Sequence, residues 1–375
     1  MDTIKAMTNI YITNDYFNNN PYFSRVCTNK SLGLFYHAKI DNLNIIYSIS
    51  RRFLQVTTSI TKFMHNNNHV IFNFNDLSLF YQKINLTLRF LFKGFPLQNF
   101  KDWNITRLDL ASNYICSSTK DKSVYIEYFK SLKYSRVNKT DYNTSVHANN
   151  KSICYNIYDK NVEAKKNNIP INDNILRVEF QFKNSYLYRK FKDIKTVDSI
   201  LGNPTLLNNL YSEKLSNIGL TIKPQTTAAL NNTLDTLNKS KKITELLTTN
   251  IKAFLNKTLN EPISSATIYR YKNILKTHNL NMNTINGSID KYIDFNDFQL
   301  FTTKYTNPLS QTLTLKYLRL LLLLLEEFII TNDCNISLEN YYICQFDMSI
   351  AFYDDSWSSN NILFFLLTLK FNNPI

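Results

Sequence analysis

A tyrosine, a lysine and a glutamate lie close together in the sequence, at Tyr158, Lys160 and Glu163. They end a segment that begins at Ile153. The residues before Tyr158 form a strand-like run, and strand alternation would place Tyr158 and Lys160 on the same face. A phenol with a pKa of about 10 is a poor nucleophile at neutral pH until a base removes its proton or a cation lowers that pKa. We therefore predict that Tyr158 attacks a phosphate and that the ammonium group of Lys160 stabilises the charge.

Two further acids lie in apolar, strand-like runs of the same half of the chain. Asp109 lies within Ile105–Ala111, and Glu179 lies within Leu176–Phe182. Together with Glu163 they offer carboxylate oxygens, which suit Mg²⁺ or Mn²⁺ better than zinc. Because such an ion polarises a phosphate, we predict a metal site formed by these three acids.

The same residues also have an ordinary structural explanation. Asp109 and Glu179 each follow an arginine by two positions, Arg107 and Arg177, so each acid can form an ion pair on a solvated strand face. Tyr158 would then only contribute packing. Spacing alone leaves both interpretations open.

Two other tyrosines compete with Tyr158 for the role of nucleophile. Tyr155 lies three residues earlier, so strand alternation turns it to the opposite face, away from Lys160. Tyr142 lies in a polar loop before the strands. Tyr158 is therefore the preferred nucleophile.

Hydrophobic periodicity predicts the elements that must hold these residues. Strand patterns cover residues 33–36, 44–50, 105–114, 145–148, 153–160 and 176–183, and helical patterns cover 77–92 and 124–132. This order predicts an α+β fold: a catalytic domain over residues 31–195, built on an antiparallel sheet with flanking helices. Residues 1–30 are expected to be an N-terminal extension with little structure.

The periodicity changes to helical after about residue 195, and residues 196–300 are expected to form a helical DNA-binding region. The segment Ser265–His278 carries Arg270 and Lys272 and no acid. It can be a recognition helix in a DNA groove or a plain surface helix, and both interpretations stay open. Residues 301–375 are predicted to form a leucine-rich helix followed by strands, with no function assigned.

Charge is distributed unevenly along the chain. The formal net charge is +14, and residues 1–200 contain 28 Lys and Arg against 15 Asp and Glu. Such a cationic field attracts polyanions, and phosphate contacts with counterion release would provide most of the non-specific affinity. We expect Arg51, Arg52, Arg107 and Arg177 to contact DNA. The other explanation of the charge is a basic protein from an A+T-rich genome.

Cysteine usage and hydropathy indicate a cytoplasmic protein. The five cysteines show no C-x-x-C pairing, which is typical of buried thiols in a reducing compartment. The first 20 residues lack the apolar core of a secretory signal. The run Leu320–Leu325 is too short to span a bilayer, so no membrane association is expected.

Five short motifs occur in an order that resembles the gene II/X family of phage and plasmid rolling-circle replication proteins. They are Ser48–Leu54, Asn75-Asp76, Ile105–Ala111, Tyr158–Glu163 and Leu176–Phe182. The resemblance covers about residues 45–195, and a weaker one links the chain to the Rep_trans plasmid initiators. Arg51-Arg52 stands where the family usually has Pro-Lys, and the His-apolar-His motif of the broader superfamily is absent.

The resemblance implies that Tyr158 nicks one strand at a phage or plasmid origin. The enzyme would stay joined to the 5′ phosphate and leave a 3′-OH primer, and it would later rejoin the strand. Lys160 would be the electrostatic partner, and Asp109, Glu163 and Glu179 would be the acids of the site. The implied partners are origin DNA, a host helicase and a host polymerase. The alternative is a non-catalytic DNA- or RNA-binding protein that controls replication or copy number.

Overall fold

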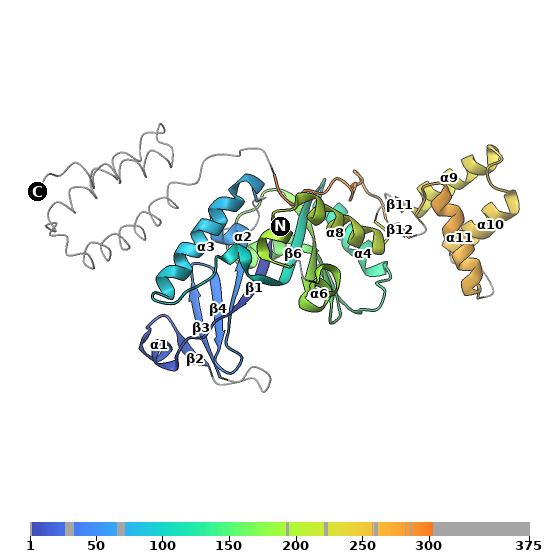
Figure 1. Cartoon of the computed structure of the whole chain (residues 1–375). Coiled ribbons are helices and arrows are strands. Elements are labelled where there is room, and N and C mark those ends of the chain that lie inside the picture. Colours follow the sequence, from blue (N-terminus) through green and yellow to red (C-terminus); the bar gives the residue numbers. More distant parts are fainter. Residues whose placement is uncertain are drawn as a thin grey trace, which may run out of the picture. The chain divides into compact units, whose positions relative to one another are not determined.

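The computed structural model describes residues 2–26, 34–65, 72–192, 195–220, 224–256, 258, 262–281, 283–285 and 287–302 (Figure 1). The fold is α+β, as the sequence predicts, and its centre is one ten-stranded antiparallel sheet with the order β2-β3-β4-β5-β1-β6-β10-β9-β8-β7. The strands are β1 (Thr3–Asn9), β2 (Ser24–Val26), β3 (Phe35–Ile40), β4 (Leu43–Ser48), β5 (Phe53–Ser59), β6 (Asn104–Cys116), β7 (Asn138–Tyr142), β8 (Ser145–Asn149), β9 (Ile153–Asp159) and β10 (Asn174–Lys183).

Eleven α-helices and two short 3₁₀ helices accompany the sheet in the described ranges. They are α1 (Asn14–Asn19), α2 (Ile60–His65), η1 (Phe74–Asp76), α3 (Leu77–Leu91), η2 (Phe100–Asp102), α4 (Thr119–Ser131), α5 (Lys160–Lys166), α6 (Asn184–Phe191), α7 (Val197–Leu201), α8 (Pro204–Asn217), α9 (Thr227–Lys239), α10 (Glu245–Leu255) and α11 (Ser265–Thr277). Two short strands, β11 (Gln225–Thr226) and β12 (Thr284–Ile285), pair in parallel.

The sheet has one apolar face and one polar face, because side chains alternate along each strand. In β10 the even-numbered residues Leu176, Val178, Phe180 and Phe182 are fully buried in the main hydrophobic core. The odd-numbered residues from Arg177 to Lys183 are all polar and lie on the other face.

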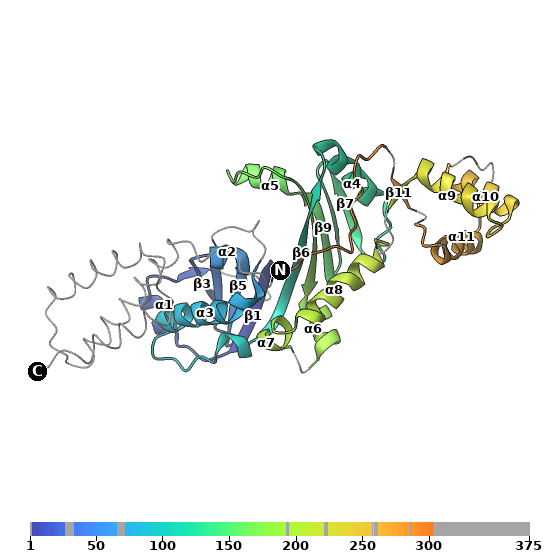
Figure 2. The ribbon, with the colours of Figure 1, turned by 90° about the horizontal axis from the view of Figure 1, so that it is seen from above.

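Helices cover the apolar face of the sheet. Buried residues of α3, α4, α7 and α8 belong to the same core as the apolar strand residues. The hydroxyl of Tyr211 in α8 donates a hydrogen bond to the backbone oxygen of Val178 at 3.0 Å, which fixes this helix to β10. In the view from above, α4, α6 and α8 lie on one side of β6 and β9 (Figure 2). The polar residues of β10 point to the other face, away from these helices.

Helices α9, α10 and α11 have a small core of their own. It contains Leu230, Leu234, Ile243, Ile251, Tyr271, Leu275 and Leu280. Ser264 caps α11, and its hydroxyl accepts a hydrogen bond from the amide of Thr267 at 3.2 Å. The helical prediction for this part of the chain is confirmed.

Two predicted boundaries need correction. The first 30 residues are not an extension with little structure, because β1 pairs with β5 on one side and β6 on the other. Residues 196–220 are helical, yet Val197, Leu207 and Tyr211 belong to the main core and not to a separate region. Non-local pairing and packing, which local periodicity does not reveal, decide both points.

The predicted helix and strands within residues 301–375 lie almost entirely outside the described residues, which end at 302. Across the part of the chain that the structure describes, no helix is long and apolar enough to cross a membrane.

Candidate functional site

Tyr158 lies near the end of β9, on the polar face of the sheet. It stands opposite Arg177 of β10 on one side and opposite Ser145 of β8 on the other. Burial raises the pKa of the Tyr158 phenol, the positive charge of Arg177 lowers it, and the charge of Glu179 raises it further. The cation beside the phenol is therefore Arg177.

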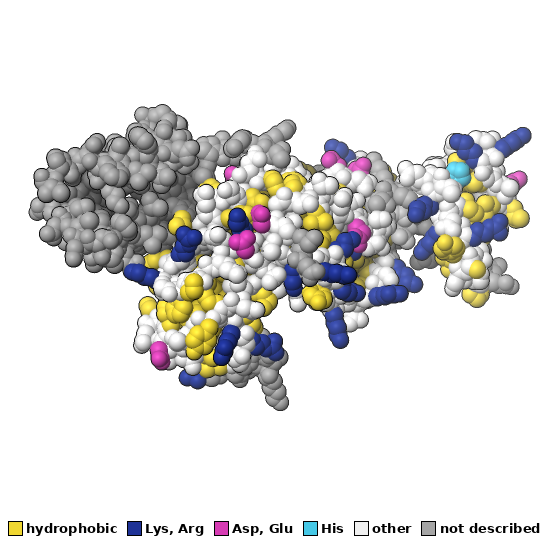
Figure 3. All heavy atoms as spheres, viewed as in Figure 1, with side chains coloured by type: hydrophobic (Ala, Val, Ile, Leu, Met, Phe, Trp, Pro, Cys, Tyr) yellow, Lys and Arg dark blue, Asp and Glu magenta, His cyan; other side chains and the backbone are white. Residues whose placement is uncertain are grey.

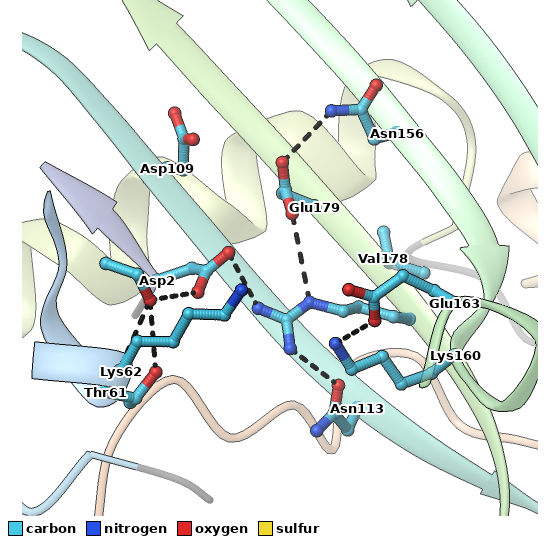
Figure 4. Close-up of polar contacts among 12 residues, drawn as sticks. Asp2, Thr61, Lys62, Asp109, Asn113, Asn156, Lys160, Glu163, Val178 and Glu179 are labelled. Carbon is cyan, nitrogen blue, oxygen red and sulfur yellow. Dashed lines mark hydrogen bonds and ion pairs between the residues drawn. The ribbon is translucent and has the colours of Figure 1, made fainter. Parts of the chain in front are cut away.

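Arg177 is the centre of a network of polar contacts, and Figure 4 labels its partners Asp2, Asn113 and Glu179. Its side chain is only 4 % exposed, and its Nη2 atom lies 3.1 Å from Oδ2 of Asp2. Its Nε atom lies 3.9 Å from Oε2 of Glu179, and its Nη1 donates to Oδ1 of Asn113 at 3.5 Å. A buried guanidinium needs such acids, because desolvation of an unpaired charge costs several kcal/mol, on the order of 3–5.

Asp2, Asp109 and Glu179 form a cluster of acids that affect one another. Burial first, and then the charges of Asp2 and Asp109, raise the pKa of Glu179 to about 7. Burial is also the main cause of the raised pKa of Asp109, and the nearby Asp2 adds to it. Negative charge is therefore concentrated at a site that is largely removed from water.

Further contacts hold the acids in place. Arg107 donates from Nε to Oδ1 of Asp109 at 2.9 Å. Asn156 donates from Nδ2 to Oε1 of Glu179 at 3.0 Å, and its own Oδ1 lies 2.7 Å from Nδ1 of His147. The ion pairs that the structural explanation predicts are present, and Tyr158 lies beside them.

Lys160 does not belong to the strand that was predicted to carry it, although its side chain still lies among the charges of Arg177 and Asp2. Strand β9 ends at Asp159, and Lys160 is the first residue of α5, so strand alternation does not extend to it. Asp159 causes this change, since its carboxylate accepts a hydrogen bond from the amide of Asn161 at 2.9 Å and caps the helix. Asp159 also forms an ion pair with the buried Lys122 of α4 at 2.7 Å.

Lys160 and Glu163 form an ion pair with each other within α5. The charge of Glu163 still affects Tyr158 and Arg177, raising the pKa of each, so the pair lies at the edge of the acid cluster. Figure 4 shows the two side chains together, apart from Asp109 and Glu179.

The two competing tyrosines have different positions. Tyr155 lies on the apolar face, where its ring centroid is 5.5 Å from that of Phe180, so it is a core residue. Tyr142 is 56 % exposed and lies opposite Ser145, which in turn lies opposite Tyr158. Tyr142 therefore shares a cross-strand row with Tyr158 at the edge of the sheet.

The other predicted DNA contacts lie at three places. Arg51 and Arg52 occupy the turn between β4 and β5, where Arg52 has a φ of 51° and stacks over the ring of Tyr11 at 5.0 Å. Arg107 and Arg177 belong to the acid cluster. Arg270 and Lys272 are exposed on α11, while Tyr271 between them is buried.

The acids of this site offer the oxygen donors that a divalent metal ion takes. The ligand set predicted from the sequence, Asp109, Glu163 and Glu179, matches the structure less well. The described residues contain no group of three or more His, Cys, Asp or Glu side chains arranged to hold a metal ion. Glu163 faces Lys160, whereas Asp2, Asp109 and Glu179 share the crowded negative charge. A divalent cation would relieve that charge, and the oxygen donors are of the type that Mg²⁺ takes.

The sequence argument missed Asp2, Asn156 and His147. Asp2 lay in the presumed extension, although Ile4, Lys5 and Ala6 alternate between apolar and polar residues in the manner of a strand. That alternation is the signal that could have revealed β1. Asn156 is neutral and gains a role only because β9 pairs with β10, and His147 is joined to it only because β8 pairs with β9.

Neither the models of known protein families nor the curated proteins yield a match to this chain.

Proposed function

We propose that this protein is a rolling-circle replication initiator that nicks one DNA strand through Tyr158. The observation that supports it best is the direct cross-strand pairing of Tyr158 with Arg177, beside the acids Asp2 and Glu179. A phenol, a buried cation and several carboxylates on the polar face of a sheet suit attack on a phosphodiester. The family resemblance supports the same assignment.

In the proposed reaction the phenol oxygen of Tyr158 attacks the scissile phosphorus. A bond forms between the tyrosine oxygen and the 5′ phosphate, and the bond to the 3′ oxygen breaks, which leaves a 3′-OH primer. The phenolic proton passes to a neighbouring carboxylate and from there to the leaving 3′ oxygen, and the guanidinium of Arg177 stabilises the negative charge. Attack of a 3′-OH on the phosphotyrosine rejoins the strand.

In this proposal Mg²⁺ or Mn²⁺ would bind among the acids Asp2, Asp109 and Glu179, which are not arranged around an ion in this structure and would have to move toward it. The ion would supply Lewis-acid polarisation of the phosphate. Glu163 and Lys160 then act at the edge of the site, through their charges. Origin DNA is the substrate, the host cytoplasm is the proposed location, and a host helicase and polymerase are the implied partners.

Covalent capture tests the proposal directly. The full chain is incubated with Mg²⁺ and single-stranded fragments that together cover the replicon encoding it. A fragment labelled at its 3′ end should give an SDS-stable adduct, because the protein stays joined to the 5′ phosphate of the downstream part. The same fragment labelled at its 5′ end should release a labelled product that a polymerase can extend. No adduct with any fragment would contradict the proposal.

A second candidate is a non-catalytic DNA- or RNA-binding protein that controls replication. The raised pKa of the Tyr158 phenol favours it, because a phenol that holds its proton is a weak nucleophile. This protein would bind origin strands and give neither adduct nor extendable product.

A further inference from the structure

A row of positive side chains crosses the polar face of the sheet at some distance from Tyr158. It contains Lys39 of β3, Lys5 of β1, Arg107 of β6 and Lys183 of β10. The strand register places these residues in line: Lys39 opposite Asn44, Asn44 opposite Thr57, Thr57 opposite Lys5, Lys5 opposite Arg107, and Arg107 opposite Lys183. We call the four cations, together with the neutral Asn44 and Thr57 between them, the cationic row.

The side chains of the cationic row share one face. On β1, Ile4 and Ala6 are fully buried on the apolar face, so Lys5 between them points the other way. On β6, Leu108 is buried in the core, and Arg107 before it points to the polar face. Neighbouring strands lie about 4.8 Å apart, so five strand-to-strand steps give the row a length of about 24 Å.

Lys5 is the most unusual member of the cationic row. It is partly buried, and it forms no ion pair with any described residue. Burial is the main cause of its lowered pKa, and the positive charge of the neighbouring Arg107 lowers that pKa further. Two cations that repel each other in a partly buried position are stabilised when an anion binds between them.

The other members leave the row open to a ligand. Lys183 donates from Nζ to the backbone oxygen of Asn150 at 2.6 Å, which positions it and leaves two of its three donors. Arg107 uses Nε and Nη2 for Asp109, which leaves its Nη1, and its side chain remains 36 % exposed. Lys39 is exposed, and it too has no ion pair among the described residues.

We propose that the cationic row binds the phosphate backbone of single-stranded DNA and leads the strand to the sheet face that holds Tyr158. Arg177, the cross-strand neighbour of Tyr158, lies six residues before Lys183 on β10, about 20 Å along the strand. The row therefore grips phosphates away from the one that is cut. This inference rests on the proposed function, because that function supplies the single strand.

The test measures binding of single-stranded DNA under conditions in which the DNA is not cleaved. Fluorescence anisotropy with labelled oligo(dT) of about 20 nucleotides is measured at several salt concentrations, in EDTA, with every variant built on Tyr158→Phe. Lys5→Gln should weaken binding about three- to tenfold at low salt, and the slope of log affinity against log salt should fall by about 0.7. Lys5→Gln combined with Lys183→Gln should lower the slope by about 1.4. Lys5→Arg should keep the slope.

A matched control separates this site from general charge. Lys101 lies in η2, which packs with α3 and α7, and its side chain is exposed. Lys101→Gln makes the same charge change and should leave the slope unaltered. The thermal midpoint of Lys5→Gln should not fall, because the substitution removes a cation beside Arg107. An unaltered slope for the Lys5→Gln, Lys183→Gln double variant would overturn the inference.

The outcomes also distinguish this inference from the proposed function. If adducts form with Tyr158 intact while substitution of Lys5 and Lys183 leaves the salt slope unchanged, only the proposal for the cationic row fails and the nicking proposal stands. If the slope depends on Lys5 and Lys183 but no fragment of the replicon gives an adduct, the nicking proposal fails and the row remains a single-strand binding surface.

Discussion

Asp2 and Arg177 form an ion pair of 3.1 Å although 174 positions separate them in the sequence. Asp2 immediately precedes β1, which pairs with β6, and β6 pairs with β10, the strand that carries Arg177. The backbone amide of Asp2 also donates to the backbone oxygen of Asp109 at 3.0 Å. The start of the chain is therefore part of the candidate site.

Loss of the buried guanidinium should strongly destabilise the fold. Arg177→Met leaves the carboxylates of Asp2 and Glu179 without their central cation, so we expect the free energy of unfolding to fall by about 3–5 kcal/mol. Urea unfolding measures it. Arg25 is exposed on β2, and Arg25→Met should change stability by less than about 0.5 kcal/mol. Equal effects of the two substitutions would contradict the role given to Arg177.

The stability of the metal-free protein should fall as pH rises toward neutrality. The pKa of Glu179 is about 7 in the folded protein, against an ordinary value of 4.5. The folded state therefore binds this proton more tightly than the unfolded state, and the resulting stabilisation is full below pH 4.5 and is lost between about pH 4.5 and 7.

Glu179→Gln isolates this contribution, because the amide mimics the protonated acid. In EDTA, the wild-type protein should lose roughly 1–3 kcal/mol more stability than Glu179→Gln when pH rises from 5 to 8. Thermal unfolding across that range gives the comparison. Parallel pH profiles for the two proteins would show that Glu179 does not titrate in this window.

Substitution of the three tyrosines should separate the nucleophile from its neighbours. Tyr158→Phe removes only the reacting oxygen, so adduct formation should disappear while affinity for single-stranded DNA stays within a few-fold. Tyr142→Phe should keep the adduct, because Tyr142 lies two strands away at the sheet edge. Tyr155→Phe should do the same, since Tyr155 faces the core. Adducts with Tyr158→Phe would transfer the role to Tyr142.

The acids should differ in their effect on metal-dependent cleavage. Asp2→Asn, Asp109→Asn and Glu179→Gln should each remove most cleavage across a Mg²⁺ titration, because a neutral amide does not offset the charge of the ion. Glu163→Gln should reduce it less, since Glu163 pairs with Lys160. If Glu163→Gln is the most damaging of the four, the ligand set predicted from the sequence is preferable to the one proposed from the structure.

Substitution of the basic residues of the β4–β5 turn and of α11 should change DNA binding in different ways. Arg51→Ala with Arg52→Ala should weaken binding to all DNA and flatten its salt dependence. Arg270→Ala with Lys272→Ala should instead lower the ratio of origin to non-specific affinity, by about 1–3 kcal/mol if one base contact is lost. Competition binding at two salt concentrations measures both quantities. An unchanged ratio would make α11 a plain surface helix.

The sequence by itself determined the strands that carry the candidate site. Alternation of apolar and polar residues is local, so the runs around Asp109, Tyr158 and Glu179 predicted β6, β9 and β10 and their common polar face. The same alternation placed Tyr155 on the opposite face, where the structure has it. The α+β class followed from the order of these patterns.

Only the tertiary structure decided which groups meet. Asp159 caps α5 and ends β9 before Lys160, so the cation beside Tyr158 comes from the neighbouring strand as Arg177. Asp2 reaches the site through pairing of β1 with β6, which joins distant segments of the chain. Periodicity records which face a residue occupies, whereas the partner across the sheet depends on strand order and register. Those are set by packing of the whole chain, and so the neighbours of Tyr158 could not be read from its own segment.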